Sequence, residues 1–108
     1  MRQTVALRFV EGAASIEKND IIFIESYRHR IVFHTSEGMY SIYMPLQEIE
    51  DMLDEDAFVR IHKSYIVSLN HVRSVSNYIL TLEDGTVFPV PRGRYKAVRD
   101  CFKKVSGL

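Results

Sequence analysis

Short runs of β-branched and aromatic residues recur along most of the chain with a period of two, and they constrain the fold most. A period of two places successive side chains on opposite faces of a strand, whereas a helix needs a period near 3.6. The runs that favour strands span residues 21–25, 30–35, 39–44, 65–67, 72–75, 78–82 and 86–88. Because turn residues separate many short runs, the pattern predicts a mostly β fold of antiparallel strands in packed sheets.

Two connections carry residues that favour particular turns. The segment 36–38 is typical of a hairpin connection. Asp84 and Gly85 supply the positive φ angles of a tight two-residue turn. In the strand before that turn, alternate residues are expected to share one face: Tyr78, Leu80 and Leu82.

Segments 45–53 and 91–105 change to a helical period, and each begins with Pro at a first-turn position. The residues expected to be buried are Leu46, Ile49 and Leu53 in the first helix and Tyr95, Val98, Phe102 and Val105 in the second. Cys101 falls on the inner side of the second helix, where a buried small hydrophobe is favoured over a nucleophile. With no repeat and no linker in view, we expect residues 1–108 to form one domain with one or two short helices.

Charge is distributed unevenly although the net charge of the 108 residues is zero. Residues 1–56 carry five Lys and Arg against eleven Asp and Glu, which gives −6, and residues 57–108 carry nine against three, which gives +6. More than half of the acidic residues of the first half lie in the run within 48–56. Charge alone leaves open whether the basic half binds an anionic partner or only keeps the protein soluble.

Several classes of protein find no support in these residues. No apolar run approaches the ~18 residues of a membrane-spanning helix, and the start Met1–Thr4 lacks the shape of a secretory signal. The single cysteine fits a reducing compartment, so a cytoplasmic protein is expected. The four histidines lack the spacing of a zinc site, and two of them are favoured as strand residues with hydrogen-bonded rings, namely His34 and His62. No cofactor motif and no nucleophile–base pair is present, so an enzyme is not expected.

Three basic connections are the candidates for a binding site. The first connection contains Arg28, His29 and Arg30, between two strands. Adjacent cationic groups repel each other unless an anion lies close, which would indicate a binding role. The alternative is a solvated turn without such a role. In segment 58–65, a bulge or loop at Lys63 would free that side chain to point outward, although basic strands at sheet surfaces are common.

The third connection leads into the second helix. A helix N-terminus prefers acidic residues, yet Arg92, Arg94 and Lys96 occupy this one. The arrangement makes sense if an external anion such as a phosphate docks there, and Arg is the side chain best suited to a bidentate contact with guanine. The alternative is a poorly optimised terminus without a binding role.

Taken in order, these segments give the chain a recognisable pattern. The chain resembles the LytTR family, the DNA-binding domains of bacterial response regulators, in the segments 20–26, 58–67 and 89–92 and at His29. The string Phe-Val-Arg-Ile-His-Lys-Ser-Tyr-Ile-Val at 58–67 matches the pattern F-x-R-x-H-[KRN]-S-[YF]-[IV]-V, which is highly specific to the family. The resemblance covers nearly the whole chain.

The resemblance implies about ten short strands, with double-stranded DNA read by loops in successive major grooves. The base-reading positions of the family fall on His29, Lys63 and Arg92, and other members carry Asn or Arg where Lys63 stands. Phosphate contacts are then assigned to Arg28, Arg30, Arg94 and Lys96. The family occupies paired direct repeats, which suggests two copies per operator. The acidic run 48–56 is expected to face away from the duplex, because its charges would repel phosphates.

The chain departs from the family pattern in two respects. Ser68 stands where members usually have Asn, and we expect it to weaken a hydrogen bond in a turn. Many relatives carry an N-terminal receiver domain, so the chain is expected to be either an excised output domain or a small free-standing regulator. A rival hypothesis is a protein-interaction or ligand-sensing β-module whose basic loops bind an acidic partner.

Overall fold

The computed structural model describes residues 3–108, which form ten strands and two α-helices. The prediction of a mostly β, antiparallel fold with one or two short helices is confirmed. Met1 and Arg2, which enter the charge count and the expectation about a secretory signal, lie outside the described residues. The strands are β1 Thr4–Phe9, β2 Gly12–Glu17, β3 Ile21–Tyr27, β4 Arg30–Thr35, β5 Gly38–Tyr43, β6 Phe58–His62, β7 Tyr65–Ser68, β8 Val72–Ser76, β9 Ile79–Leu82 and β10 Val87–Pro89, and the helices are α1 Leu46–Glu50 and α2 Arg92–Ser106.

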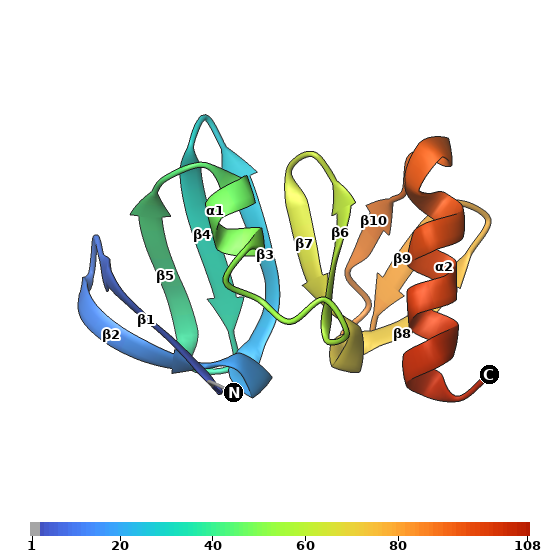
Figure 1. Cartoon of the computed structure of the whole chain (residues 1–108), viewed down its shortest axis with the longest axis horizontal. Coiled ribbons are helices and arrows are strands. Elements are labelled where there is room, and N and C mark those ends of the chain that lie inside the picture. Colours follow the sequence, from blue (N-terminus) through green and yellow to red (C-terminus); the bar gives the residue numbers. More distant parts are fainter. Residues whose placement is uncertain (1–2) are drawn as a thin grey trace.

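The strands form three antiparallel sheets. The central sheet has the order β5-β4-β3-β7-β6, the second is the β1–β2 hairpin, and the third has the order β10-β9-β8. The β1–β2 hairpin lies at one end of the molecule, and the third sheet with α2 lies at the other (Figure 1). The central sheet therefore separates two layers that come from the two ends of the chain.

Each side of the central sheet faces its own hydrophobic core. Because side chains alternate along a strand, the neighbours Ile66 and Val67 in β7 belong to different cores. The core beneath the β1–β2 hairpin and α1 is formed by Val5, Phe9, Ile16, Ile21, Ile24, Ile31, Phe33, Leu46, Ile49, Phe58 and Ile66. The core beneath α2 and the third sheet is formed by Ile61, Val67, Val72, Leu80, Leu82, Phe88, Val90 and Val98.

The β1–β2 hairpin is absent from the strands predicted by periodicity. Gly12 and the small residues that follow it, Ala13 and Ala14, have low β-propensity, so the local signal is weak. The hairpin forms through tertiary contacts instead, because its apolar residues enter the first core and the Val10 N–H donates to the Ser41 carbonyl at 2.8 Å.

Three sequence predictions about local geometry are wrong. Helix α1 ends at Glu50, three residues earlier than expected, and only a turn follows it. The connection after β9 spans the four residues 83–86, and of its two expected positive φ angles only that of Gly85 is found. Tyr78 does not share a strand face with Leu80 and Leu82, because it lies in the turn before β9.

The second helix is less deeply buried than its periodicity suggests. Val98 is buried, whereas Val105 is exposed and Cys101 is half-buried instead of buried. Helix α2 packs against β6, β8 and the segment Leu69–His71, and the residues that reach the second core are Val98 and, in part, Tyr95 and Phe102. Within residues 3–108, no helix has both the length and the apolar character needed to cross a membrane.

A carboxylate helps to hold the β1–β2 hairpin against the edge of the central sheet. The Glu11 oxygens accept hydrogen bonds from the Ser41 N–H at 2.7 Å and the Ser41 hydroxyl at 2.8 Å. The backbone hydrogen bond and then the hydroxyl bond hold the pKa of Glu11 below its ordinary value of 4.5. Since the folded-state pKa is lowered, this contribution to stability is present above the unfolded value and is lost as the pH falls through the folded value.

We therefore expect Glu11→Gln to remove part of the acid sensitivity of folding. The urea midpoint of the wild type should fall more steeply than that of the variant as the pH drops below about 4.5. At pH 7 the variant should be the less stable of the two. Parallel midpoint curves at every pH would contradict this role of Glu11.

Candidate nucleic-acid interface

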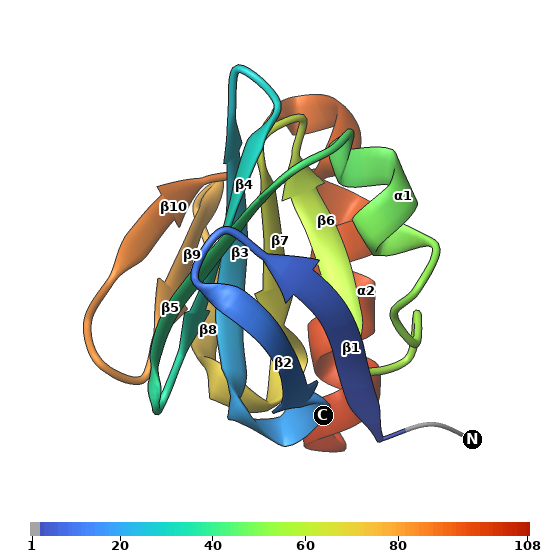
Figure 2. The same ribbon diagram turned by 90° about the vertical axis from the view of Figure 1, so that its left-hand side faces the viewer.

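The three basic connections predicted from the sequence lie on one side of the molecule, which is the upper edge in Figure 1 and is called the basic end below. The β3–β4 turn with His29, the β6–β7 turn with Lys63 and the start of α2 with Arg92 are at the upper end in both views (Figures 1 and 2). All three of these side chains are exposed. Segments far apart in the sequence thus bring three exposed cationic or titratable residues to the same side of the molecule.

The β3–β4 turn has an unusual backbone. Arg28 and His29 have φ angles of 50° and 66°, and Tyr27 pairs with Arg30 across the turn. Two successive left-handed residues make a two-residue turn that normally favours Asn-Gly, so each of these larger residues costs on the order of 1–2 kcal/mol. The turn is held by the Met44 N–H, which donates to the His29 carbonyl at 3.0 Å. The strained turn places the His29 side chain at the tip of the hairpin.

The sequence places Arg30 both in the basic connection and at the start of the strand run 30–35, and the structure agrees with the second placement. Arg30 is the first residue of β4 and not part of the turn, so only Arg28 and His29 occupy the tip. Arg30 is exposed, and its Nη2 donates to the Ser41 hydroxyl at 3.4 Å. The Arg28 guanidinium lies over the Tyr27 ring, 5.3 Å from its centroid. Both residues are exposed, although the Arg30 guanidinium reaches along the sheet to the buried Ser41.

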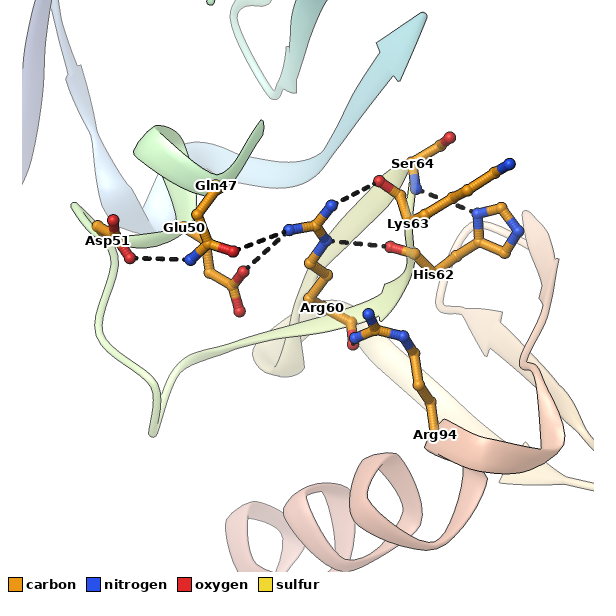
Figure 3. A network of polar contacts seen from close by, with 8 residues as sticks. All are labelled: Gln47, Glu50, Asp51, Arg60, His62, Lys63, Ser64 and Arg94. Carbon is orange, nitrogen blue, oxygen red and sulfur yellow. Dashed lines mark hydrogen bonds and ion pairs between the residues drawn. The ribbon is translucent and has the colours of Figure 1, made fainter. Parts of the chain in front are cut away.

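The β6–β7 turn is organised by the side chain of Arg60 (Figure 3). Its Nη2 donates to the Lys63 carbonyl at 2.7 Å and its Nε donates to the His62 carbonyl at 3.3 Å. Its Nη1 pairs with Glu50 at 3.2 Å and contacts the Gln47 amide oxygen at 3.4 Å. The Arg60 fork therefore fixes the backbone on which Lys63 stands and joins it to α1.

A bulge and two further hydrogen bonds complete this turn. The pairing of β6 with β7 shifts between Arg60 and His62, so the strand is broken just before Lys63. The Ser64 N–H donates to His62 Nδ1 at 3.1 Å, and the Ser26 N–H of β3 donates to the Ser64 carbonyl at 2.9 Å. The latter bond ties the Lys63 turn to the hairpin that carries His29. Lys63 itself points outward and forms neither an ion pair nor a side-chain hydrogen bond within residues 3–108.

Arg92, the first residue of α2, lies against an aromatic pair. Its guanidinium is 5.0 Å from the centroid of the Tyr78 ring, and that ring lies 4.4 Å from the Tyr95 ring. Tyr78 and Asn77 have φ angles of 63° and 52°, so the β8–β9 turn repeats the left-handed geometry of the β3–β4 turn. The guanidinium is thus supported on one side by an aromatic face.

The start of α2 is electropositive. Its first turn contains no acidic residue and no side-chain cap, so the positive end of the helix dipole adds to the charges of Arg92 and Arg94. Arg94 Nη1 donates to the Arg60 carbonyl at 3.3 Å, which joins the helix to β6, while Lys96 is exposed on the next turn. An anion such as a phosphate is a suitable ligand for this corner.

The histidines on strands have partners, as the sequence predicted. His34 Nε2 lies 2.7 Å from Glu25 Oε1, and its ring stacks on Phe23 with centroids 4.1 Å apart. His62 accepts from the Ser64 N–H. Within residues 3–108, no three His, Cys, Asp or Glu side chains gather where they could hold a metal ion.

The acidic segment starts near the basic end and then leaves it. Glu50 in α1 pairs with Arg60, and Asp54 pairs with Lys18 at 3.5 Å. In both views the chain after α1 descends toward the opposite end of the molecule (Figures 1 and 2). That this segment faces away from DNA stays a prediction.

Two residues of this end were not singled out for their role by the sequence. The sequence indicates Arg60 only as a strand residue, because its hydrogen bonds to the turn depend on a bulge that the residue pattern does not locate. Tyr78 was read as a strand residue, although the Asn77 beside it is a residue that tolerates left-handed φ and signals a turn. That signal could have located the turn, but not the contact with Arg92.

Comparison with known proteins matches the chain to a DNA-binding domain and to transcriptional regulators. The family model described as the LytTr DNA-binding domain matches residues 12–103. The chain is 34% identical over 99 residues to the CO-responsive transcriptional regulator RcoM of Rhodospirillum rubrum, which covers 88% of this chain and 42% of RcoM. It is 29% identical to the transcriptional regulatory protein LytR of Staphylococcus aureus, which covers 87% of this chain and 40% of LytR. The chain thus spans about two-fifths of the length of these relatives.

A solved structure shares the fold. The chain superposes on a LytTr DNA-binding domain from Bacillus cereus with a TM-score of 0.76 and 24% sequence identity, and the match covers 100% of both chains. At this identity the likeness establishes the shared architecture of ten strands and two helices.

Proposed function

Because the chain belongs to the LytTR family of DNA-binding domains, we propose that it reads a promoter sequence through the three basic connections at one end of the molecule. His29, Lys63 and Arg92 contact base edges in successive major grooves. The contacts with phosphates, which position the domain without reading sequence, come from Arg28, Arg30, Arg94 and Lys96. The chain is a DNA-binding domain and not an enzyme.

The observation that carries the proposal is the convergence of the three connections at one end (Figure 1). A major groove about 12 Å wide admits a two-stranded β-ribbon, and two of the connections are the tips of antiparallel strand pairs. The three connections follow one another along the longest axis of the molecule, in the order β3–β4 turn, β6–β7 turn and start of α2, as contacts with successive grooves of one duplex require.

We further propose that the chain acts as the output domain of a signal-responsive transcription regulator in the cytoplasm, with two copies on paired direct repeats. The names of two relatives, a CO-responsive transcriptional regulator and a sensory transduction protein of Bacillus subtilis, support a role in signalling. Residues 1–108 then contribute the DNA-binding part of such a protein as one domain.

Selection of bound sequences from a random duplex pool at physiological salt tests the proposal. We expect enrichment of a short repeated element whose affinity exceeds that of a scrambled control. The enrichment should be lost in the His29→Ala, Lys63→Ala and Arg92→Ala variants. Failure to enrich any element, with no preference over the scrambled duplex, would favour the rival protein-interaction or ligand-sensing module.

The salt dependence of binding separates DNA recognition from binding of an acidic protein. If the basic groups neutralise about five phosphates, log K should fall with log[salt] with a slope near −4.5. Lys96→Ala should make the slope shallower by about 0.9 on any sequence, since it removes one phosphate contact. A wild-type slope near zero would contradict the phosphate assignments.

A further inference from the structure

We infer that Tyr78 is a positioning residue that holds the Arg92 guanidinium ready for its base contact. The inference rests on the proposed base-reading role of Arg92. It adds the β8–β9 turn, which carries Tyr78, to the segments that support DNA recognition at the basic end. Tyr78 is not assigned to contact DNA itself. It acts through Arg92.

The backbone of Tyr78 is fixed independently of its ring. Tyr78 and Asn77 occupy the two central positions of the β8–β9 turn in left-handed conformations, and Ser76 pairs with Ile79 across it. The Val90 N–H donates to the Tyr78 carbonyl at 2.8 Å, which ties the turn to the segment that leads into α2. The turn therefore has a defined position relative to Arg92, two residues beyond Val90.

A tyrosine is a poor residue for this turn on local grounds. Positive φ at both central positions favours Asn and Gly, and Asn77 already follows that preference. Tyr78 is 41% exposed and belongs to neither hydrophobic core. A residue that breaks a local rule at a functional end is best explained by a contact that its side chain makes.

That contact is with Arg92. The ring has Tyr95 near it at 4.4 Å and the Arg92 guanidinium at 5.0 Å, so the aromatic pair forms a platform for the cation. Within residues 3–108, the Arg92 side chain makes no ion pair and no hydrogen bond, so the contact with the Tyr78 ring is its main restraint. An arginine that is already restrained loses less rotamer freedom when it binds, which favours the complex.

The free protein provides the first test. The Arg92 side-chain protons lie over the Tyr78 ring and should be shielded by its ring current in NMR spectra. Tyr78→Asn, which keeps a residue that tolerates left-handed φ, should shift these signals to ordinary arginine values, and Tyr78→Phe should keep the shielding. Ordinary Arg92 shifts in the wild type would overturn the inference without involving DNA.

Binding provides the second test. Tyr78→Asn should weaken binding to the selected site about two- to fivefold, while Tyr78→Phe stays near the wild type. In an Arg92→Ala background, Tyr78→Asn should have no further effect, a coupling that a merely structural role would not produce. Asn77→Gly, which preserves the turn and leaves the ring, is the matched control and should bind as the wild type does.

The outcomes distinguish the inference from the proposed function. If Arg92→Ala abolishes sequence preference but Tyr78→Asn acts additively with it or weakens scrambled DNA equally, only the positioning role fails. If the wild type itself shows no sequence preference, the proposed function fails, and the NMR shifts alone then decide whether Tyr78 restrains Arg92. The unfolding midpoint of Tyr78→Asn is expected near the wild-type value, because relief of the unfavourable backbone conformation offsets the loss of the contact with Tyr95.

Discussion

Arg92→Ala is expected to weaken binding to the selected site by about 1–3 kcal/mol, roughly fivefold to 150-fold, and to relax the preference at one base pair. An arginine at the mouth of α2 can donate two parallel hydrogen bonds to guanine, and alanine removes both. Titration of the selected duplex and of single-base variants, at one fixed salt concentration, measures the effect. The stability of the fold should change little, because the Arg92 side chain is exposed.

The informative comparison for Arg92 is with a cation that contacts phosphate. Lys96→Ala is the cleaner control, because Arg94 also donates to the Arg60 carbonyl and its removal would loosen the junction between α2 and β6. Lys96→Ala should weaken cognate and scrambled DNA alike, whereas Arg92→Ala should act mainly on the cognate site. Equal losses on the two duplexes for Arg92→Ala would remove it from the base-reading set.

Strand periodicity and residue type were sufficient to locate most of the fold. Strands such as β3 and β4 carry β-branched and aromatic side chains at most positions, because both faces of the central sheet are covered. The β1–β2 hairpin has a weaker strand pattern in its sequence. It is held by contacts with β5, which is distant in the sequence. Local propensity is informative only where tertiary contacts do not override it.

The candidate site was predictable in composition but not in geometry. The positions of His29, Lys63 and Arg92 at connections follow from the strands around them. Antiparallel pairing within the central sheet places the turns of His29 and Lys63 at the same edge, but it does not place Arg92, which follows a separate sheet. The left-handed turn at Arg28-His29 could not be predicted, because it lacks the Asn-Gly signal of such turns. Asn77 does signal the turn before β9, but not the contact that Tyr78 makes with Arg92. The bulge before His62 depends on how Arg60 folds back over the turn, which no pattern in the sequence reports.

Arg60→Ala is expected to lower the free energy of unfolding by about 2 kcal/mol and to weaken cognate binding as well. The substitution removes two hydrogen bonds from a charged donor to the His62 and Lys63 carbonyls. Because water reaches this turn, each bond contributes less than the roughly 1.5–3 kcal/mol of a bond to a charged group. Its ion pair with the half-exposed Glu50 adds little, because solvent screens it. Urea unfolding measures the loss of stability, and hydrogen exchange at the Ser64 and Ser26 amides reports on the turn.

Two conservative variants separate the charge of Arg60 from its shape. Lys keeps the positive charge near Glu50 but lacks the planar fork, so Arg60→Lys should retain part of the stability while the Ser64 amide exchanges faster and cognate binding falls. Glu50→Gln should change stability by less than about 1 kcal/mol and leave binding intact, since the fork still reaches both carbonyls. If Arg60→Lys matched the wild type in exchange and affinity, the charge alone would account for the role of Arg60. Faster exchange with an unchanged affinity would show that Lys63 reads DNA from a turn that needs no support.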